Sequence, residues 1–178
     1  MTNSLPAQKV VFDTPWFRVV ERNPPGYSSP HYSLQTRNYV SIVAVDQSGS
    51  LLLVRQFRPT LWQATLEIPS GHVEEGQKPE EAARIELFEE TGHEVEHMEL
   101  LCNLSPDTGR IGNRMWCFFA GNARPTSNTA YQPEEGVDFV RYESGMRALL
   151  EEKEFCSALN RAALFAAVVQ GKISLNIN

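Results

Sequence analysis

The chain has 178 residues, of which 42% are apolar and 21% charged, and its formal net charge is −6 at pH 7. These values are typical of one globular domain that buries a core without disulfides, and the acidic balance argues against general nucleic-acid binding. No apolar run reaches the roughly 18 residues needed to span a bilayer, and the N-terminus lacks the apolar core of a signal peptide, so we expect no membrane partner. Three cysteines without paired spacing favour a reduced, cytoplasmic location.

The first half of the chain is rich in strand signals. Short β-branched and apolar runs predict two strands within residues 9–21, broken near Pro15, and further strands at 31–36, 38–45 and 51–57. A turn-rich loop at 22–30 and a hairpin turn at 46–50 separate them. Residues 61–71 then lead toward a helix.

That helix is predicted to begin at Pro79 and to end before Gly92. Proline suits the first helical position because its missing N–H costs nothing there. Glu80 and Glu81 face the positive end of the helix dipole. Gly92 can adopt the left-handed conformation that ends a helix.

The second half alternates strands and helices. It predicts strands at 94–105, 114–121 and 137–142, a long polar loop at 122–136, and helices at 146–152 and 156–171. The last helix is apolar on nearly all sides, so we expect it to be buried against the sheet or a partner. Strands on both sides of one central helix indicate a mixed α/β or α+β sandwich.

The central helix carries three carboxylates on one face. Glu86, Glu89 and Glu90 stand at i, i+3 and i+4, and like charges this close destabilise a helix unless a cation lies among them. Acidic residues on a helix are more often a solvated face than a metal site. Oxygen ligands on a rigid element nevertheless suit Mg²⁺ or Mn²⁺, so a divalent metal site is the first hypothesis.

The stretch GHVEEGQKPEEAARIELFEETGH, residues 71–93, resembles the Nudix box of the Nudix hydrolase family. That signature reads G-x5-E-x7-R-E-U-x-E-E-x-G-U, where U is a bulky apolar residue. The positions that match it are Gly71, Glu86, Leu87, Glu89, Glu90 and Gly92. The positions that depart from it are Gln77 for Glu, Ile85 for Arg and His93 for an apolar residue.

The resemblance implies an α/β fold, a Nudix-type α/β/α sandwich around a mixed β-sheet with a short N-terminal β segment. Residues 1–37 would form N-terminal strands and a candidate dimerisation segment, and 38–178 the Nudix hydrolase domain. Glu86 and Glu90 would be the principal ligands of Mg²⁺ or Mn²⁺, and Glu89 would share a metal or a bound water. The backbone carbonyl of Ser70 would complete the coordination.

The segment before the box, LLLVRQFRPTLWQATLEIPSG, resembles the ADP-ribose pyrophosphatases and related nucleoside diphosphate sugar hydrolases. In that branch Arg58 matches a phosphate-contacting arginine, as a guanidinium fork would suit, and Glu67 matches a ligand-contacting glutamate. The loop SPDTGRIGN would bring Arg110 and Asn113 to the substrate. An N-terminal aromatic ring, Trp16 or Tyr32, would stack on adenine across a homodimer interface.

A further acidic residue on a distal loop orients the attacking water or acts as base in this branch. The strand match favours Asp138, whereas Glu134 and Glu135 in the preceding loop have longer reach. The sequence leaves all three open, with the two glutamates ranked ahead.

The expected function is divalent-metal-dependent hydrolysis of the diphosphate bond of ADP-ribose or a related nucleoside diphosphate sugar. The products would be a nucleoside monophosphate and a sugar phosphate. The alternative, raised by Gln77 and Ile85, is a catalytically weakened Nudix module that binds a nucleotide as a sensor or regulator. The enzyme is favoured because losing a group that only orients ligands costs about 10–100-fold in metal affinity or activity.

Overall fold

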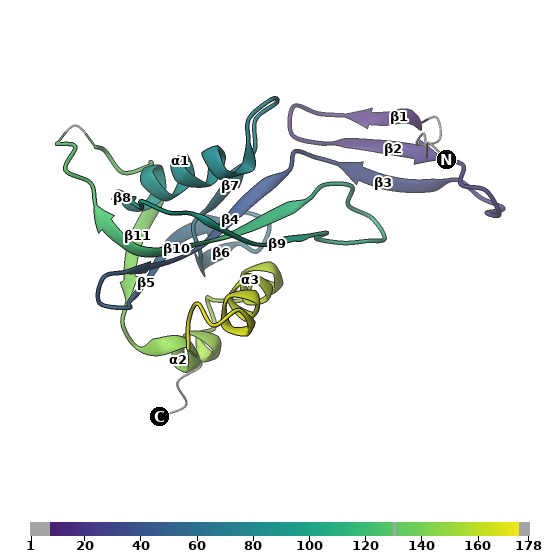
Figure 1. Ribbon diagram of the computed structural model, residues 1–178. Coiled ribbons are helices and arrows are strands. Elements are labelled where there is room, and N and C mark those ends of the chain that lie inside the picture. The colour runs from purple at the N-terminus through teal and green to yellow at the C-terminus, as the bar shows by residue number, and fades with distance from the viewer. Residues whose placement is uncertain (1–7, 130, 175–178) are drawn as a thin grey trace.

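The computed structural model describes residues 8–129 and 131–174. Its helices are α1 (Pro79–Thr91), α2 (Gly145–Glu151) and α3 (Ala158–Val169) (Figure 1). Its strands are β1 (Gln8–Asp13), β2 (Arg18–Arg22), β3 (His31–Gln35), β4 (Tyr39–Asp46), β5 (Leu51–Arg58), β6 (Gln63–Glu67), β7 (Ser70–His72), β8 (His93–Glu94), β9 (Glu99–Leu104), β10 (Met115–Pro125) and β11 (Val137–Tyr142).

The strands form two sheets. The first three pair in the order β1-β2-β3, and this small antiparallel sheet projects from one side of the molecule (Figure 1). The large sheet has the order β11-β5-β4-β10-β8, with β6, β7 and β9 paired at its sides. It is mixed, because β10 runs parallel to β4 while the other pairs are antiparallel.

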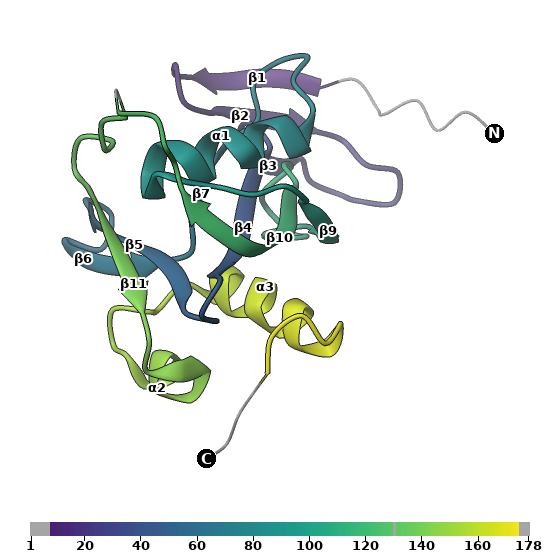
Figure 2. The ribbon, with the colours of Figure 1, turned by 60° about the vertical axis from the view of Figure 1, so that its left-hand side comes forward.

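Helices cover both faces of the large sheet, as Figure 2 shows for α1 and α3. Leu87 of α1 packs with Ile42 and other apolar residues of one face, and Leu164 of α3 belongs to a second cluster with Leu53 on the opposite face. Burying these apolar side chains on two sides of one sheet gives the expected α/β/α sandwich. Among the described residues, no helix is both long and apolar enough to cross a membrane.

Helix α1 begins and ends where the sequence predicts. Pro79 is its first residue, and Gly92 caps its C-terminus with φ 68°, donating its N–H to the carbonyl of Phe88 at 2.8 Å. A residue with a side chain would be strained at this φ, so glycine ends the helix at low cost.

Two expectations for the strands need correction. Residues 61–71 are not merely a connection to α1 but contain β6 and β7, and residues 94–105 do not form one strand because β8 and β9 are separated by an irregular stretch. Both β6 and β7 are short; β6 forms a hairpin with the preceding β5, whereas β7 pairs with the more distant β4. With only three residues, β7 depends on its long-range partner rather than on a local alternating pattern.

The C-terminal helix is less buried than its composition suggests. One face of α3 packs on the sheet through Ala163, Leu164 and Ala167, whereas Phe165 and Val169 are exposed. Its apolar surface is therefore only partly covered by the described part of the chain.

Candidate active site

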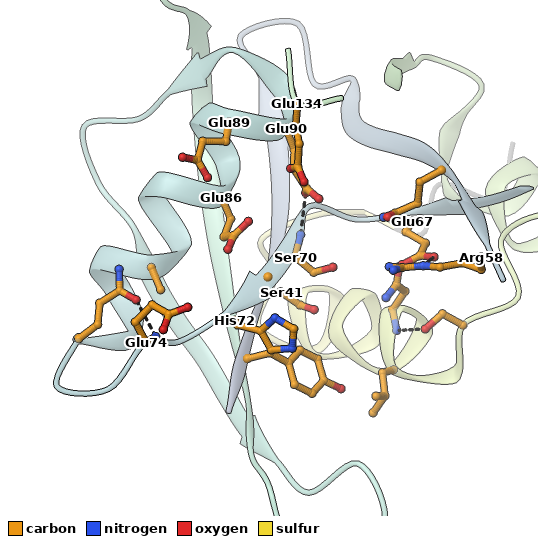
Figure 3. Close-up of a pocket in the computed structure, with 18 residues that line it drawn as sticks. Ser41, Arg58, Glu67, Ser70, His72, Glu74, Glu86, Glu89, Glu90 and Glu134 are labelled. Carbon is orange, nitrogen blue, oxygen red and sulfur yellow. Dashed lines mark hydrogen bonds and ion pairs between the residues drawn. The ribbon is translucent and has the colours of Figure 1, made fainter. Parts of the chain in front are cut away.

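A cavity of about 610 Å³ lies between α1, the centre of the large sheet and the start of α3 (Figure 3). Its size is in the range of small-molecule sites. Strands β4 and β5 pair only at Ala44–Leu52 and Val45–Leu51, after which β4 pairs with β7 and β5 with β6. The two strands thus separate, and the cavity lies where they do.

Three carboxylates meet on the α1 side of this cavity. Oxygen atoms of Glu86, Glu90 and Glu134 lie within 4.8 Å of one another. Glu90 is 4% exposed and accepts a hydrogen bond from the backbone N–H of Ser70 at 2.9 Å. The carboxylate of Glu86 lies against Gly71, where a Cβ would be only 1.9 Å from Oε1. Glycine at position 71 therefore makes room for a carboxylate of α1.

The protonation equilibria of this group are displaced. Burial, together with the charges of Glu89, Glu134 and Glu74, raises the pKa of Glu86 to about 7. Burial is also the main cause that raises the pKa of Glu90 to about 8; the hydrogen bond from Ser70 opposes it, repulsion from Glu86 and Glu134 adds to it, and the charge of Arg58 has a smaller, lowering effect. Clustered, desolvated carboxylates are stable in ionised form only beside a compensating cation.

The donor set fits a hard divalent cation. Glu86, Glu90 and Glu134 offer oxygen ligands from a rigid helix and a facing loop, as Mg²⁺ and Mn²⁺ prefer. Ser70 lines the same cavity, and Glu89 is exposed at its rim, outside the close group of three. The ion-ligand roles of Glu86, Glu90, Glu89 and Ser70 all remain predictions.

On the side toward β5 and β6, Arg58 and Glu67 form a bidentate ion pair (Figure 3). Arg58 donates from Nε to Oε1 at 2.7 Å and from Nη2 to Oε2 at 2.6 Å, and Thr65 donates to Oε1 at 2.5 Å. Burial raises the pKa of Glu67, but the hydrogen bonds from Arg58 and Thr65 outweigh it, so the net pKa is lowered. The pair holds the guanidinium at the cavity wall in a fixed orientation.

Other predicted substrate residues lie elsewhere. Arg110 contacts His31, Asn113 donates to the carbonyl of Arg37 at 2.9 Å, and Trp16 is exposed at the turn between β1 and β2. None of the three predicted residues lines the cavity. Their contact with substrate stays a prediction, and within one chain they belong to the region of the small sheet.

Of the three distal acids, the structure brings Glu134 to the carboxylate cluster. Glu135 does not line the cavity, and Asp138 lies on β11 opposite Arg55. The loop that carries Glu134 is attached to α1 by Tyr131, whose ring packs edge-on against Phe88 at a centroid distance of 5.3 Å. The Tyr131 hydroxyl also donates to the backbone carbonyl of Glu89 at 3.2 Å.

The three departures from the Nudix signature have separate environments. Ile85 is 45% exposed on α1, and Gln77 accepts a hydrogen bond from the backbone N–H of Glu74 at 2.9 Å. His93 is buried and packs on Phe139 at a centroid distance of 5.0 Å. None of these three displaces the carboxylates from one another.

Sequence reasoning missed Ser41, Gln56 and Tyr131. Ser41 and Gln56 line the cavity from the two separating strands, and Tyr131 positions the loop of Glu134. A serine within the apolar run YVSIVAV was a usable signal, because a polar residue in a buried strand is more informative than an exposed one. No local sequence feature pointed to Gln56 or Tyr131.

Clustered carboxylates whose oxygen atoms fit a divalent cation, facing an arginine fork, are typical of enzymes that handle phosphate groups. A profile of the NUDIX domain family matches residues 35–157, so the chain belongs to the Nudix family. The expected Nudix-type sandwich is confirmed by a solved structure described as an ADP compounds hydrolase. That structure superposes on this chain with a TM-score of 0.77 and 26% sequence identity, and the match covers 94% of this chain and 95% of the other.

Characterised relatives match over shorter stretches. The methanol dehydrogenase activator of Bacillus methanolicus is 30% identical over 66% of this chain and 64% of its own length. The ADP-ribose pyrophosphatase of Bacillus subtilis (strain 168) is 39% identical, covering 39% of this chain and 38% of its own. The ADP-sugar pyrophosphatase of Mus musculus is 44% identical, covering 39% and 34%. The chain thus spans about a third to two thirds of these relatives.

Proposed function

We propose that this protein hydrolyses the diphosphate bond of ADP-ribose or a related nucleoside diphosphate sugar in a divalent-metal-dependent reaction. With ADP-ribose, water and substrate would yield AMP and ribose 5-phosphate. The observation that carries the proposal is the meeting of Glu86, Glu90 and Glu134 in the cavity that also holds Arg58. The relatives named for ADP-ribose and ADP-sugar pyrophosphatase activity and the ADP compounds hydrolase structure support the choice of substrate class.

Each part of the cavity has a task in this reaction. Glu86 and Glu90 would hold a Mg²⁺ or Mn²⁺ ion, which would supply charge neutralisation on the diphosphate and polarisation of the phosphoryl group. Arg58, oriented by Glu67, would contact phosphate oxygens. Glu134 is positioned to orient the attacking water or accept its proton, because it reaches the same cluster from a separate loop.

The decisive experiment measures release of nucleoside monophosphate from ADP-ribose, ADP-glucose, GDP-mannose, NADH and diadenosine polyphosphates. Each assay is run with Mg²⁺, with Mn²⁺ and with chelator. Glu90→Gln should abolish metal-dependent turnover, whereas Glu81→Gln, an exposed glutamate of the same helix outside the cavity, should retain it. Full activity of Glu90→Gln would refute the metal assignment.

A second pair of variants tests the distal acid. Glu134→Gln should lower kcat by about 100-fold or more, while Glu135→Gln should remain close to the wild type. The reverse result would move the role to Glu135. Absence of turnover across the whole panel, with nucleotide binding retained, would favour the sensor or regulator instead.

We also propose that the small sheet mediates a homodimer. All six residues of β1 are exposed, including Val10, Val11 and Phe12, as is the neighbouring Trp16. Apolar side chains gathered on one protruding element are typical of an interaction surface. Light scattering on the whole chain and on Phe12→Asp should show a dimer that the substitution weakens; a monomeric wild type would refute the proposal.

A further inference from the structure

Two polar atoms at the cavity are buried and have no hydrogen-bond partner within residues 8–129 and 131–174. Neither Ser41 Oγ nor Gln56 Nε2 has a hydrogen-bond partner among the residues that the structure describes. Ser41 is 1% exposed, and both residues line the cavity that holds the carboxylates. Because a buried polar group without a partner lowers stability, its place at a cavity wall points to a role in binding.

The fold places these two side chains at the same opening. Ser41 lies on β4 in the part that pairs with β7, and Gln56 lies on β5 in the part that pairs with β6. These are the parts of β4 and β5 that have separated from each other. Figure 3 shows Ser41 beside Ser70, between the carboxylates of α1 and the pair formed by Arg58 and Glu67.

We propose that Ser41 and Gln56 form a subsite that hydrogen-bonds hydroxyl groups of the terminal sugar of the substrate. This inference rests on the proposed hydrolase function. Both side chains are uncharged; the hydroxyl of Ser41 can donate and accept, and the amide of Gln56 donates from Nε2. A sugar hydroxyl matches both, whereas the diphosphate is matched by a metal ion and the guanidinium of Arg58.

The surroundings favour a sugar over a base. The cavity extends to Ser157 and Asn160 at the start of α3, which add short polar side chains. Proteins commonly hold nucleic-acid bases by stacking them on aromatic faces, and the rings predicted for adenine, Trp16 and Tyr32, lie outside this cavity. The two rings that do line it, Tyr39 and His72, are register neighbours on β4 and β7. The terminal sugar offers several hydroxyl groups to neutral partners; the adenosine ribose also carries hydroxyl groups, and ADP, which keeps that ribose, distinguishes the two.

The test compares two ligands that differ by that sugar. KM for ADP-ribose and the inhibition constant of ADP are measured for the wild type, Ser41→Ala, Gln56→Leu and the double variant. Each single variant should raise KM for ADP-ribose by about 2- to 10-fold and the double variant by about 10- to 100-fold, with inhibition by ADP unchanged. kcat should change less than KM, because neither residue belongs to the group of three carboxylates that would hold the ion and position the water.

Stability distinguishes a binding role from a structural one. Since Ser41 Oγ has no partner to lose among the described residues, Ser41→Ala should keep or raise Tm. Ser50→Ala is the matched control. Ser50 is also buried, but its hydroxyl contacts that of Ser48 at 3.1 Å at the β4–β5 turn, so this variant should lower Tm slightly and leave KM unchanged.

Three outcomes would overturn the subsite: unchanged KM for ADP-ribose in the double variant, an equal loss of ADP affinity, or a clear fall of Tm in Ser41→Ala. If the wild type hydrolyses none of the panel, calorimetric titration with ADP-ribose and ADP in Mg²⁺ replaces the kinetic comparison. Selective loss of ADP-ribose affinity in the variants would then support the subsite although the hydrolase had failed. Equal affinities, or no binding by the wild type, would refute it.

Discussion

Gly71→Ala should weaken metal binding while leaving the fold intact. The φ of Gly71 lies outside the left-handed region, so alanine fits the backbone. The added Cβ, however, would lie 1.9 Å from Oε1 of Glu86 and 2.0 Å from its Cδ. Ordinary contact begins near 3.4 Å, so the carboxylate must move by about 1.5 Å. The carboxylate is the end of the flexible Glu86 side chain, so it can move into the cavity while the backbone stays in place.

A displacement of that size takes a ligand out of coordination. Mg²⁺ requires oxygen distances of about 2.0–2.1 Å in near-octahedral geometry, so a ligand moved by most of that length is lost. We expect Mg²⁺ affinity to fall by about 10- to 100-fold, the range known for disturbing ligand orientation. Stability without metal should be equal or higher by about 0.4–1 kcal/mol, because alanine reduces the entropy of the unfolded chain.

The assay pairs thermal unfolding without metal with calorimetric titration of Mg²⁺ and Mn²⁺. Gly112→Ala is the matched control, because a Cβ there would be in ordinary contact at 3.4 Å with the carbonyl of Leu34, outside the cavity. A folded Gly71→Ala protein with wild-type metal affinity would refute the role of Glu86. A large loss of Tm without metal would show that position 71 serves packing instead.

Three more predictions concern the surroundings of the site. Without metal, the folded protein favours the protonated forms of Glu86 and Glu90, whose pKa values are raised to about 7 and about 8. Their contribution to stability is therefore complete below the unfolded pKa of 4.5 and is lost as pH rises through 7 to 8. The rise of Tm on adding Mg²⁺ should therefore grow between pH 6 and pH 8.5, and a rise independent of pH would contradict these pKa values. The side-chain oxygen of Asn160 accepts a hydrogen bond at 2.8 Å from the buried backbone N–H of Ile68, between β6 and β7. Asn160→Ala removes this acceptor, so the free energy of unfolding measured in urea should fall by about 1–3 kcal/mol. An unchanged midpoint and slope would refute this contact. Tyr131→Ala should release the loop of Glu134 and lower kcat by about tenfold or more with little effect on Tm. Tyr131→Phe keeps the ring packing, so its kcat should fall less. Equal kcat in the wild type and both variants would show that the ring does not position the loop.

The sequence by itself determined the central helix and its acidic face. Pro79, Gly92 and the spacing of Glu86 and Glu90 are local features, and local backbone preferences act within a few residues. The same stretch also identified the family, because the spacing of its glycines and glutamates is specific. Most strands were recognisable for a related reason, since β-branched and apolar runs bounded by turns need no distant partner to be recognised.

Only the tertiary structure decided which distant residues join that helix. It brought Glu134 rather than Glu135 to the carboxylates of α1, placed the ion pair of Arg58 and Glu67 at the same cavity, and left Ser41 Oγ without a hydrogen-bond partner among the described residues. It also paired β7, which has only three residues, with the distant β4. These outcomes depend on the separation of two central strands and on the path of a long loop. Such long-range contacts follow from packing of the whole chain, so no local stretch of sequence specifies them.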